Sequence, residues 1–120
     1  MLEYVLIRSE SDFNEKLSRD DYVDFLFTHL EQFGDPKADI NACIDYAFAD
    51  SKYAGGFCLA AFYDKKLAGA LIMNDTGMRG YIPENILVYI AVDGSLRGKG
   101  LGRQIIEKAF TLCEGNVKLH

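Results

Sequence analysis

The segment from Asp93 to Arg103 combines glycine and basic residues in a way that favours anion binding. Glycines stand at positions 94, 98, 100 and 102, and the bases Arg97 and Lys99 lie among them. The apolar run Ile86–Val92 precedes the segment and a stretch of helical periodicity follows it, so we expect a strand-to-helix turn. The first amides of a helix have no partner within the helix and lie at the positive end of its dipole. Glycine removes the Cβ atoms that would keep a ligand away. These features predict a site for phosphate or pyrophosphate.

The spacing of these residues decides which of the known phosphate-binding sequence patterns the segment matches. A dinucleotide-binding pattern beginning at Gly98 needs glycine or alanine at position 103, where Arg103 stands. A P-loop pattern needs glycine at position 93 and serine or threonine at position 100, and Asp93 and Gly100 break both requirements. The pattern Arg-x-x-Gly-x-Gly does fit, with Arg97, Gly100 and Gly102. A glycine-rich turn that served only strand–helix packing would not need three bases.

Together with the strand Ile90–Val92 before it and the helix after it, this segment resembles the central motif of the GNAT superfamily of N-acetyltransferases. The specific resemblance covers residues 86–113, whereas residues 1–85 agree in the order of elements. It implies acetyl-CoA as donor and a primary amine as acceptor, joined in a ternary complex for direct transfer. It also implies that the pyrophosphate binds the loop amides and that the pantetheine arm lies along the strand as an added strand would. The residues so assigned to the cofactor are Ile90, Ala91, Val92, Arg97, Gly98, Lys99, Gly100, Leu101, Gly102 and Arg103.

The same resemblance indicates candidates for catalysis. A backbone amide in the region of Ile90 is the expected oxyanion donor. The position at which relatives often carry a glutamate base is Ile86, which cannot act as one. Glu84, two residues earlier, is the candidate base acting through water, and the alternative is a solvated loop acid after Pro83. Relatives take the general acid from a tyrosine beyond the fifth strand, and the chain stops at His120, inside that strand.

Two consequences are expected from that end point. The 120 residues are expected to be inactive alone, with a homodimer or a second polypeptide completing the sheet. One alternative function is a non-catalytic CoA-binding or interaction module that has lost the general acid. A second alternative is an unrelated domain that binds another phosphate ligand.

The elements that position the segment are expected in the order β-α-α-β-β-β-α-β, within a single domain. This order predicts an α+β, three-layer fold, with a mixed, mostly antiparallel sheet and flanking helices, that is truncated within the fifth strand. Acceptor-side helices are expected over about residues 12–51 and the acetyl-CoA-binding core over about residues 56–120. The apolar run Ile86–Val92 should be central and covered on both faces. The final strand–helix–strand unit predicts parallel neighbours, and the strand opening at Val117 must splay away from Ile90–Val92 to admit the arm.

Local signals predict the bounds of these elements. Ser18 followed by an acid three residues later is typical of a helix N-cap, and Asp39 is a second candidate. The remaining expected elements are a first strand Tyr4–Arg8, helices ending before Gly34 and near Phe48, a hairpin of Phe57–Tyr63 and Leu67–Asp75 about the turn Asp64–Lys66, a third helix Gly100–Cys113 and a strand from Asn116.

The distribution of charge along the chain limits the classes of partner that we expect. The net charge is −5, but residues 1–50 hold 12 acids and 4 bases while residues 51–120 hold 6 acids and 9 bases. An acidic half attracts cations and repels nucleic acid, so we expect a cationic amine acceptor, small or peptidic, and no nucleic acid. The resemblance implies that the two N-terminal helices border the acceptor, and Asp35, Asp39 and Glu31 are the acids nearest the link between them. The alternative is two solvated helix faces.

Cysteine usage and the absence of long apolar runs indicate the compartment. The odd count of Cys43, Cys58 and Cys113, without a CxxC pair, favours buried, inert thiols over disulfides or a metal site. The first residues do not resemble a secretory signal, and no run of 18 apolar residues occurs, so a cytoplasmic location without membrane contact is expected. His29 is interpreted as a half-buried helix residue rather than a base or a ligand.

Overall fold

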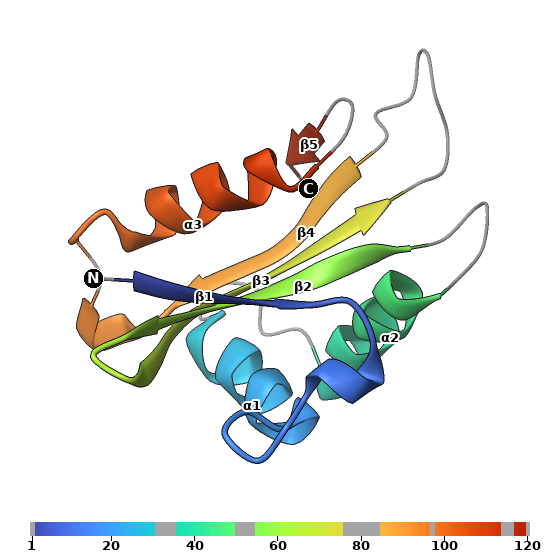
Figure 1. Ribbon diagram of the computed structural model, residues 1–120, viewed down its shortest axis with the longest axis horizontal. Helices are drawn as coiled ribbons and strands as arrows, with labels where there is room; N and C mark the ends of the chain where they lie inside the picture. Colours follow the sequence, from blue (N-terminus) through green and yellow to red (C-terminus); the bar gives the residue numbers. More distant parts are fainter. Residues whose placement is uncertain are drawn as a thin grey trace.

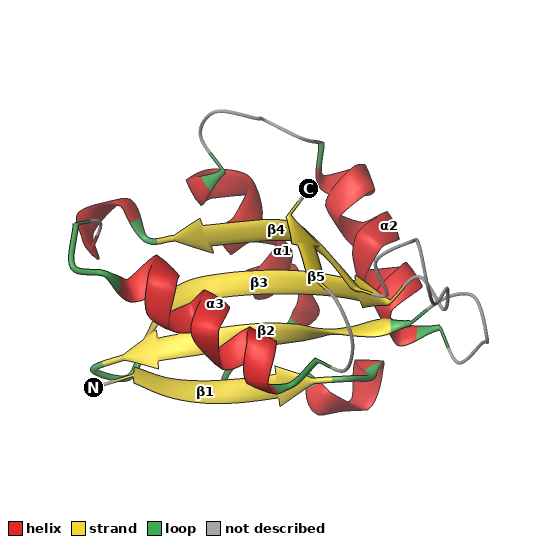
Figure 2. Cartoon of the chain, turned by 90° about the horizontal axis from the view of Figure 1, so that it is seen from above, coloured by secondary structure: helices red, strands yellow, loops and turns green. Residues whose placement is uncertain are grey.

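A twisted β-sheet forms the middle layer of the computed structural model, which describes residues 2–30, 36–49, 55–75, 85–96 and 98–113, and the backbone of 117–119. Helices lie on both faces of this sheet (Figures 1 and 2). The elements are β1 (Leu2–Ile7), the 3-10 helix η1 (Glu10–Asp12), α1 (Arg19–His29), α2 (Lys37–Phe48), β2 (Gly56–Tyr63), β3 (Lys66–Asp75), β4 (Asn85–Val92), the 3-10 helix η2 (Gly94–Leu96), α3 (Leu101–Thr111) and β5 (Val117–Leu119).

The strands of the described residues lie side by side in chain order, from β1 to β5. β1 to β4 are antiparallel neighbours, and β5 runs parallel to β4. The predicted α+β class, the order of elements and the mixed, mostly antiparallel sheet are therefore confirmed.

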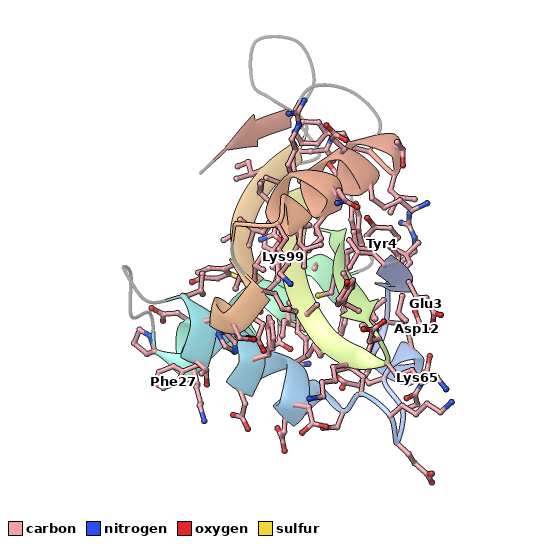
Figure 3. The ribbon with its side chains drawn as sticks, turned by 90° about the vertical axis from the view of Figure 1, so that its left-hand side faces the viewer. Glu3, Tyr4, Asp12, Phe27, Lys65 and Lys99 are labelled. Atoms are coloured by element: carbon pink, nitrogen blue, oxygen red, sulfur yellow. The ribbon has the colours of Figure 1, made fainter. Side chains whose placement is uncertain are left out.

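Each face of the sheet has its own core. α1 and α2 pack on one face, where Ile7, Cys58 and Ile72 are fully buried, and α3 packs on the other. Tyr4 of β1 belongs to the α3 side, where its hydroxyl lies 3.4 Å from the carbonyl oxygen of Gln104 (Figure 3). β4 contacts α1 on one face and α3 on the other, which is the physical reason for its unbroken apolar sequence.

The predicted start of the first helix is confirmed, whereas the predicted start of the second is wrong. The Ser18 side chain accepts a hydrogen bond from the Asp21 amide at 3.1 Å, as an N-cap does. α2 begins at Lys37, with Pro36 at its N-cap, and Asp39 lies in the first turn. The Asp39 amide already donates to the carbonyl oxygen of Pro36 at 2.9 Å. Asp39 therefore lies inside the helix and is not its N-cap.

The β2–β3 hairpin uses a shorter turn than the sequence suggests. Tyr63 pairs with Lys66, so only Asp64 and Lys65 form the loop, and both have positive φ, at 51° and 68°. Two-residue loops of this handedness match the twist of the strands. Lys66, expected in the turn, begins β3.

The three thiols differ in burial. Cys58 is fully buried beneath α1, and desolvation raises the pKa of its thiol to about 12. Cys43 and Cys113 are only partly buried, so the prediction of buried thiols holds for Cys58 alone. None of the helices within the described ranges is long and apolar enough to cross a membrane.

Candidate functional site

The outer edge of β4 is paired with a strand for only part of its length. β5 pairs with Asn85–Leu87, and the register ends there within the described residues. Ile90–Val92 continue past this point with β3 on one side and no described strand on the other. An extended ligand could pair with this stretch of β4 as an added strand.

A β-bulge separates the paired part of β4 from the open part. Ile72 of β3 pairs with Tyr89, whereas the next residue, Met73, pairs with Leu87, so Val88 is an extra residue on β4. A bulge bends its strand and increases the local twist. Val88 and Tyr89 accordingly both contact the core beneath α1 and α2, while Leu87 belongs to the opposite core.

The register also decides which backbone groups of β4 are directed outward. The Asp93 amide donates to the carbonyl oxygen of Ala68 at 2.8 Å. Bonded and non-bonded pairs alternate along an antiparallel ladder, so Ala91 also directs its backbone groups toward β3. Ile90 and Val92 then direct theirs out of the open edge. The edge can therefore pair with a ligand through Ile90 and Val92, rather than through all three residues of the predicted set.

The turn before α3 leaves its backbone accessible. Gly98 and Gly100 have φ of 85° and 76°, and a Cβ atom at either would meet nothing within 4 Å. Gly100 is the N-cap of α3, and its carbonyl oxygen accepts from the Gln104 amide at 3.2 Å. The amides of Leu101, Gly102 and Arg103 thus precede the first i→i−4 hydrogen bond of the helix. Open space over free helix amides fits a pyrophosphate group.

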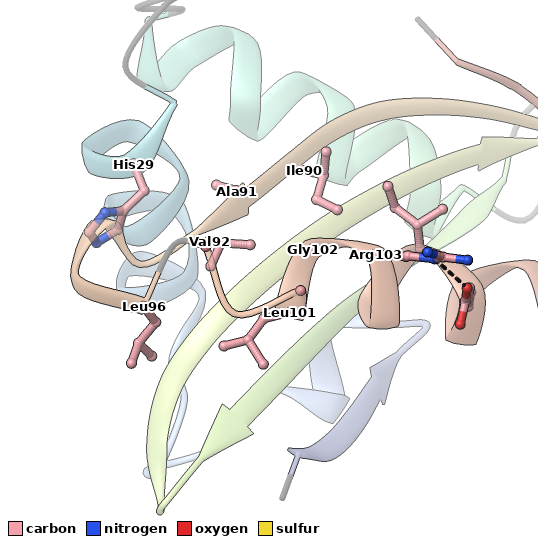
Figure 4. A pocket seen from close by; sticks show the side chains of 12 residues that line it. His29, Ile90, Ala91, Val92, Leu96, Leu101, Gly102 and Arg103 are labelled. Atoms are coloured by element: carbon pink, nitrogen blue, oxygen red, sulfur yellow. Dashed lines mark hydrogen bonds and ion pairs between the residues drawn. The ribbon is translucent and has the colours of Figure 1, made fainter.

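One cavity of about 740 Å³ joins the open edge of β4 to the start of α3 (Figure 4). Its lining comprises His29, Ile90, Ala91, Val92, Leu96, Gly98, Gly100, Leu101, Gly102, Arg103, Ile106 and Glu107. Eight of the ten residues assigned to the cofactor from sequence are therefore brought together. Lys99 is exposed and is not among the lining residues, while Arg97 and the candidate base Glu84 lie outside the described residues. The roles of all these residues stay predictions.

The charged groups of the cavity come from the first turns of α3. Arg103 is 86% exposed, and its Nε lies 3.0 Å from a carboxylate oxygen of Glu107, one turn later. The other guanidinium nitrogens remain at the rim for an anion, because the ion pair uses one nitrogen. Among the described residues, no group of three or more His, Cys, Asp or Glu side chains is arranged to hold a metal ion.

Four lining residues were not assigned to the site from the sequence. Leu96 adjoins the glycine motif, and Ile106 and Glu107 lie four residues after Gly102 and Arg103, so helical spacing could have located them. His29 is different, because α1 contributes it from far away in the sequence. Its half-burial was predicted correctly, with 20% of the side chain exposed, but its position in this cavity was not.

Comparison with known proteins places this arrangement in a family. The model of the acetyltransferase (GNAT) family matches residues 14–120. A comparison with curated protein sequences finds no significant match.

Solved structures of acetyltransferases share the fold. A Bacillus subtilis acetyltransferase, solved in complex with CoA, is 24% identical with a TM-score of 0.57, and the match covers 93% of this chain and 60% of that one. An acyl-CoA N-acyltransferase from Pseudomonas aeruginosa is 16% identical with a TM-score of 0.72, covering 99% and 78%. The ribosomal-protein-alanine N-acetyltransferase of Brucella melitensis is 19% identical with a TM-score of 0.59, covering 100% and 80%. With the family model matching most of its length, the chain belongs to the acetyltransferase (GNAT) family.

Proposed function

We propose that this chain binds acetyl-CoA in the cavity between β4 and α3 and transfers the acetyl group to a primary amine. The observation that carries the proposal is the continuity of one cavity over two features, the open edge at Ile90–Val92 and the free amides at the start of α3. The first suits the amide-bearing pantetheine arm, and the second suits the pyrophosphate.

The protein groups supply positioning and charge stabilisation. Acetyl-CoA, when bound, supplies an acetyl group activated as a thioester. The outward amide of Ile90 is the group we assign to hydrogen-bond the oxygen that becomes negative during transfer, and such a fixed donor stabilises that charge better than mobile water. The amides of Leu101, Gly102 and Arg103 hold the phosphate end and so fix the distance between the two ends of the cofactor.

The proton transfers need a base that accepts from the amine. A lysine-like amine has a pKa of about 10.4 and must lose a proton before it can attack. His29 is poorly suited to that role, because its Nδ1 accepts a hydrogen bond from the Gly94 amide at 3.2 Å. In the neutral ring the proton is then on Nε2, so neither nitrogen is a vacant acceptor. Glu84, acting through water, stays our proposed base.

A cationic amine is the proposed acceptor class. The proposal rests on the excess of acids in residues 1–50, the part of the chain that contains α1 and α2. Two structural neighbours are named aminoglycoside acetyltransferases, one of them in complex with sisomicin, and their names support an amine-bearing acceptor. The alternative, a CoA-binding module without transfer activity, would keep the cavity and show no turnover.

Calorimetry and thiol release test the proposal together. The chain is titrated with CoA, acetyl-CoA and ATP, and free thiol is then followed with acetyl-CoA and a panel of polyamines, peptides and anionic acceptors. We expect CoA to bind, ATP to compete poorly, and thiol release with cationic acceptors, in a form whose sheet is completed, to weaken as salt is raised. CoA binding by that completed form without thiol release would favour the binding module. Equal binding of ATP and CoA would contradict the cofactor assignment.

A further inference from the structure

The loop that follows β4, Asp93 together with η2, is held by hydrogen bonds at four consecutive amides. The Asp93 amide donates to the carbonyl oxygen of Ala68 at 2.8 Å, and the Leu96 amide donates to that of Asp93 at 2.9 Å. The Ser95 amide donates to Oδ1 of Asp93 at 2.8 Å. The fourth amide, that of Gly94, donates to Nδ1 of His29 at 3.2 Å. Three of the four partners therefore come from the sheet or the loop, and the fourth is a side chain from α1.

His29 is held in place on several sides. Its ring lies 4.5 Å from the ring of Phe25, measured between centroids, one turn earlier on α1. Its Nε2 lies 4.0 Å from Oδ2 of Asp93, so the imidazole meets the loop with both nitrogens. The Ser95 hydroxyl donates to the other oxygen of that carboxylate at 2.7 Å, and the hydrogen bonds from Ser95 lower the pKa of Asp93. An ionised, oriented Asp93 thus faces the Nε2 side of the ring.

We propose that His29, on α1, is a positioning residue. By holding the Gly94 amide, it sets the shape of the loop that leads into the cofactor-binding turn. This inference rests on the function proposed above, because the loop leads directly from the open edge of β4 to Gly98 and Gly100. The amide of Gly94 is bonded to His29, whereas the amides from Leu101 to Arg103 are left for the ligand. A loop that is already ordered loses less freedom on binding. His29 therefore raises the affinity for CoA without touching the reacting atoms.

Two substitutions separate the hydrogen bond from the bulk of the ring. His29→Leu fills similar space without an acceptor. His29→Asn keeps an acceptor, Oδ1, that is as many covalent bonds from Cα as Nδ1 is in histidine, so it can still accept a hydrogen bond from the Gly94 amide. One hydrogen bond of this kind corresponds to about a three- to tenfold change in an equilibrium. We expect CoA affinity to fall by about that factor in His29→Leu and to stay within about twofold of the unsubstituted protein in His29→Asn.

NMR on the same proteins supplies a readout independent of cofactor binding. In the unsubstituted protein, the nitrogen shifts of His29 should report the tautomer with Nε2 protonated, and the Gly94 amide should exchange slowly. That protection should be lost in His29→Leu and kept in His29→Asn. The tautomer measurement needs no variant, so it applies even if His29→Leu does not fold.

Two outcomes would overturn the inference. Equal CoA affinity in all three folded proteins would show that the contact does not set the loop for binding. Equal weakening in both variants would assign the effect to the ring's packing. If the unsubstituted protein itself failed to bind CoA while the Gly94 amide behaved as expected, the proposed function would fall and the structural link would stand.

Discussion

Replacing Gly100 by alanine tests the cofactor loop with the smallest possible change. Gly100 has a φ of 76°, and a Cβ atom there meets nothing within 4 Å. The left-handed conformation costs a residue with a Cβ about 1–2 kcal/mol. Loss of glycine freedom in the unfolded chain offsets about 0.4–1 kcal/mol of that cost. We therefore expect a net loss of about 1 kcal/mol, which lowers the melting temperature by about 4 °C in a domain of this size.

The effect on cofactor binding should be larger than the effect on folding. If the substituted alanine keeps the native backbone, its methyl group occupies the space over the free helix amides. If the backbone relaxes instead, the amides of Leu101 and Gly102 rotate away from the cavity. Either response removes part of the anion site, so we expect CoA affinity to fall at least tenfold, or about 1.4 kcal/mol.

Calorimetry with CoA and thermal unfolding are measured on Gly100→Ala and on a matched control. The control is Ile44→Val, a fully buried position in α2 that is not among the residues lining the cavity. That substitution costs about 0.5–1.5 kcal/mol of stability, similar to the expected loss at Gly100. The control should bind CoA normally. If both variants bound CoA like the unsubstituted protein, the assignment of the pyrophosphate to this loop would be refuted.

Three further predictions concern the scaffold of the site. A Cβ at Gly69 would stand 2.3 Å from Cδ1 of Ile105, so Gly69→Ala should lower the free energy of unfolding, measured by chemical denaturation, by about 1–3 kcal/mol. Adding Ile105→Val, which removes Cδ1, should recover part of that loss. If the losses of the two single variants simply added in the double variant, this contact would be contradicted. Tyr22→Phe should cost about 1 kcal/mol in the same assay, because the buried hydroxyl donates to the carbonyl oxygen of Leu71 at 2.6 Å; an unchanged midpoint would show that the bond is not stabilising. The pKa of the buried Cys58 thiol is raised to about 12, so the folded state keeps this proton above pH 9 while the unfolded chain loses it. The contribution of Cys58 to the free energy of unfolding should therefore fall by about 1.4 kcal/mol between pH 8 and pH 10. A Cys58→Ala variant whose free energy of unfolding had the same pH slope would argue against this.

Much of the site's chemistry was readable from the sequence because it depends on local structure. The positive φ of Gly100, the free amides at the start of α3 and the apolar face of that helix all follow from residues within a few positions of one another. The glycine spacing therefore sufficed to predict a strand–loop–helix anion site and the family. The Ser18 cap was predictable for the same reason, whereas the start of α2 was missed because Pro36 competes with Asp39 for the helix N-terminus.

Features that depend on strand register or on contacts between layers were decided by the tertiary structure. The register with β3, shifted by the bulge at Val88, selects Ile90 and Val92 as the outward residues of β4, and one residue of slippage would reverse that choice. The contact of His29 with the Gly94 amide joins segments 65 residues apart in the chain. No periodicity in either segment encodes it, because it exists only once α1 and β4 pack on each other. The sequence by itself thus determined the order of strand, loop and helix and predicted an anionic ligand for the loop, and the packing of the layers decided which backbone groups face the cavity.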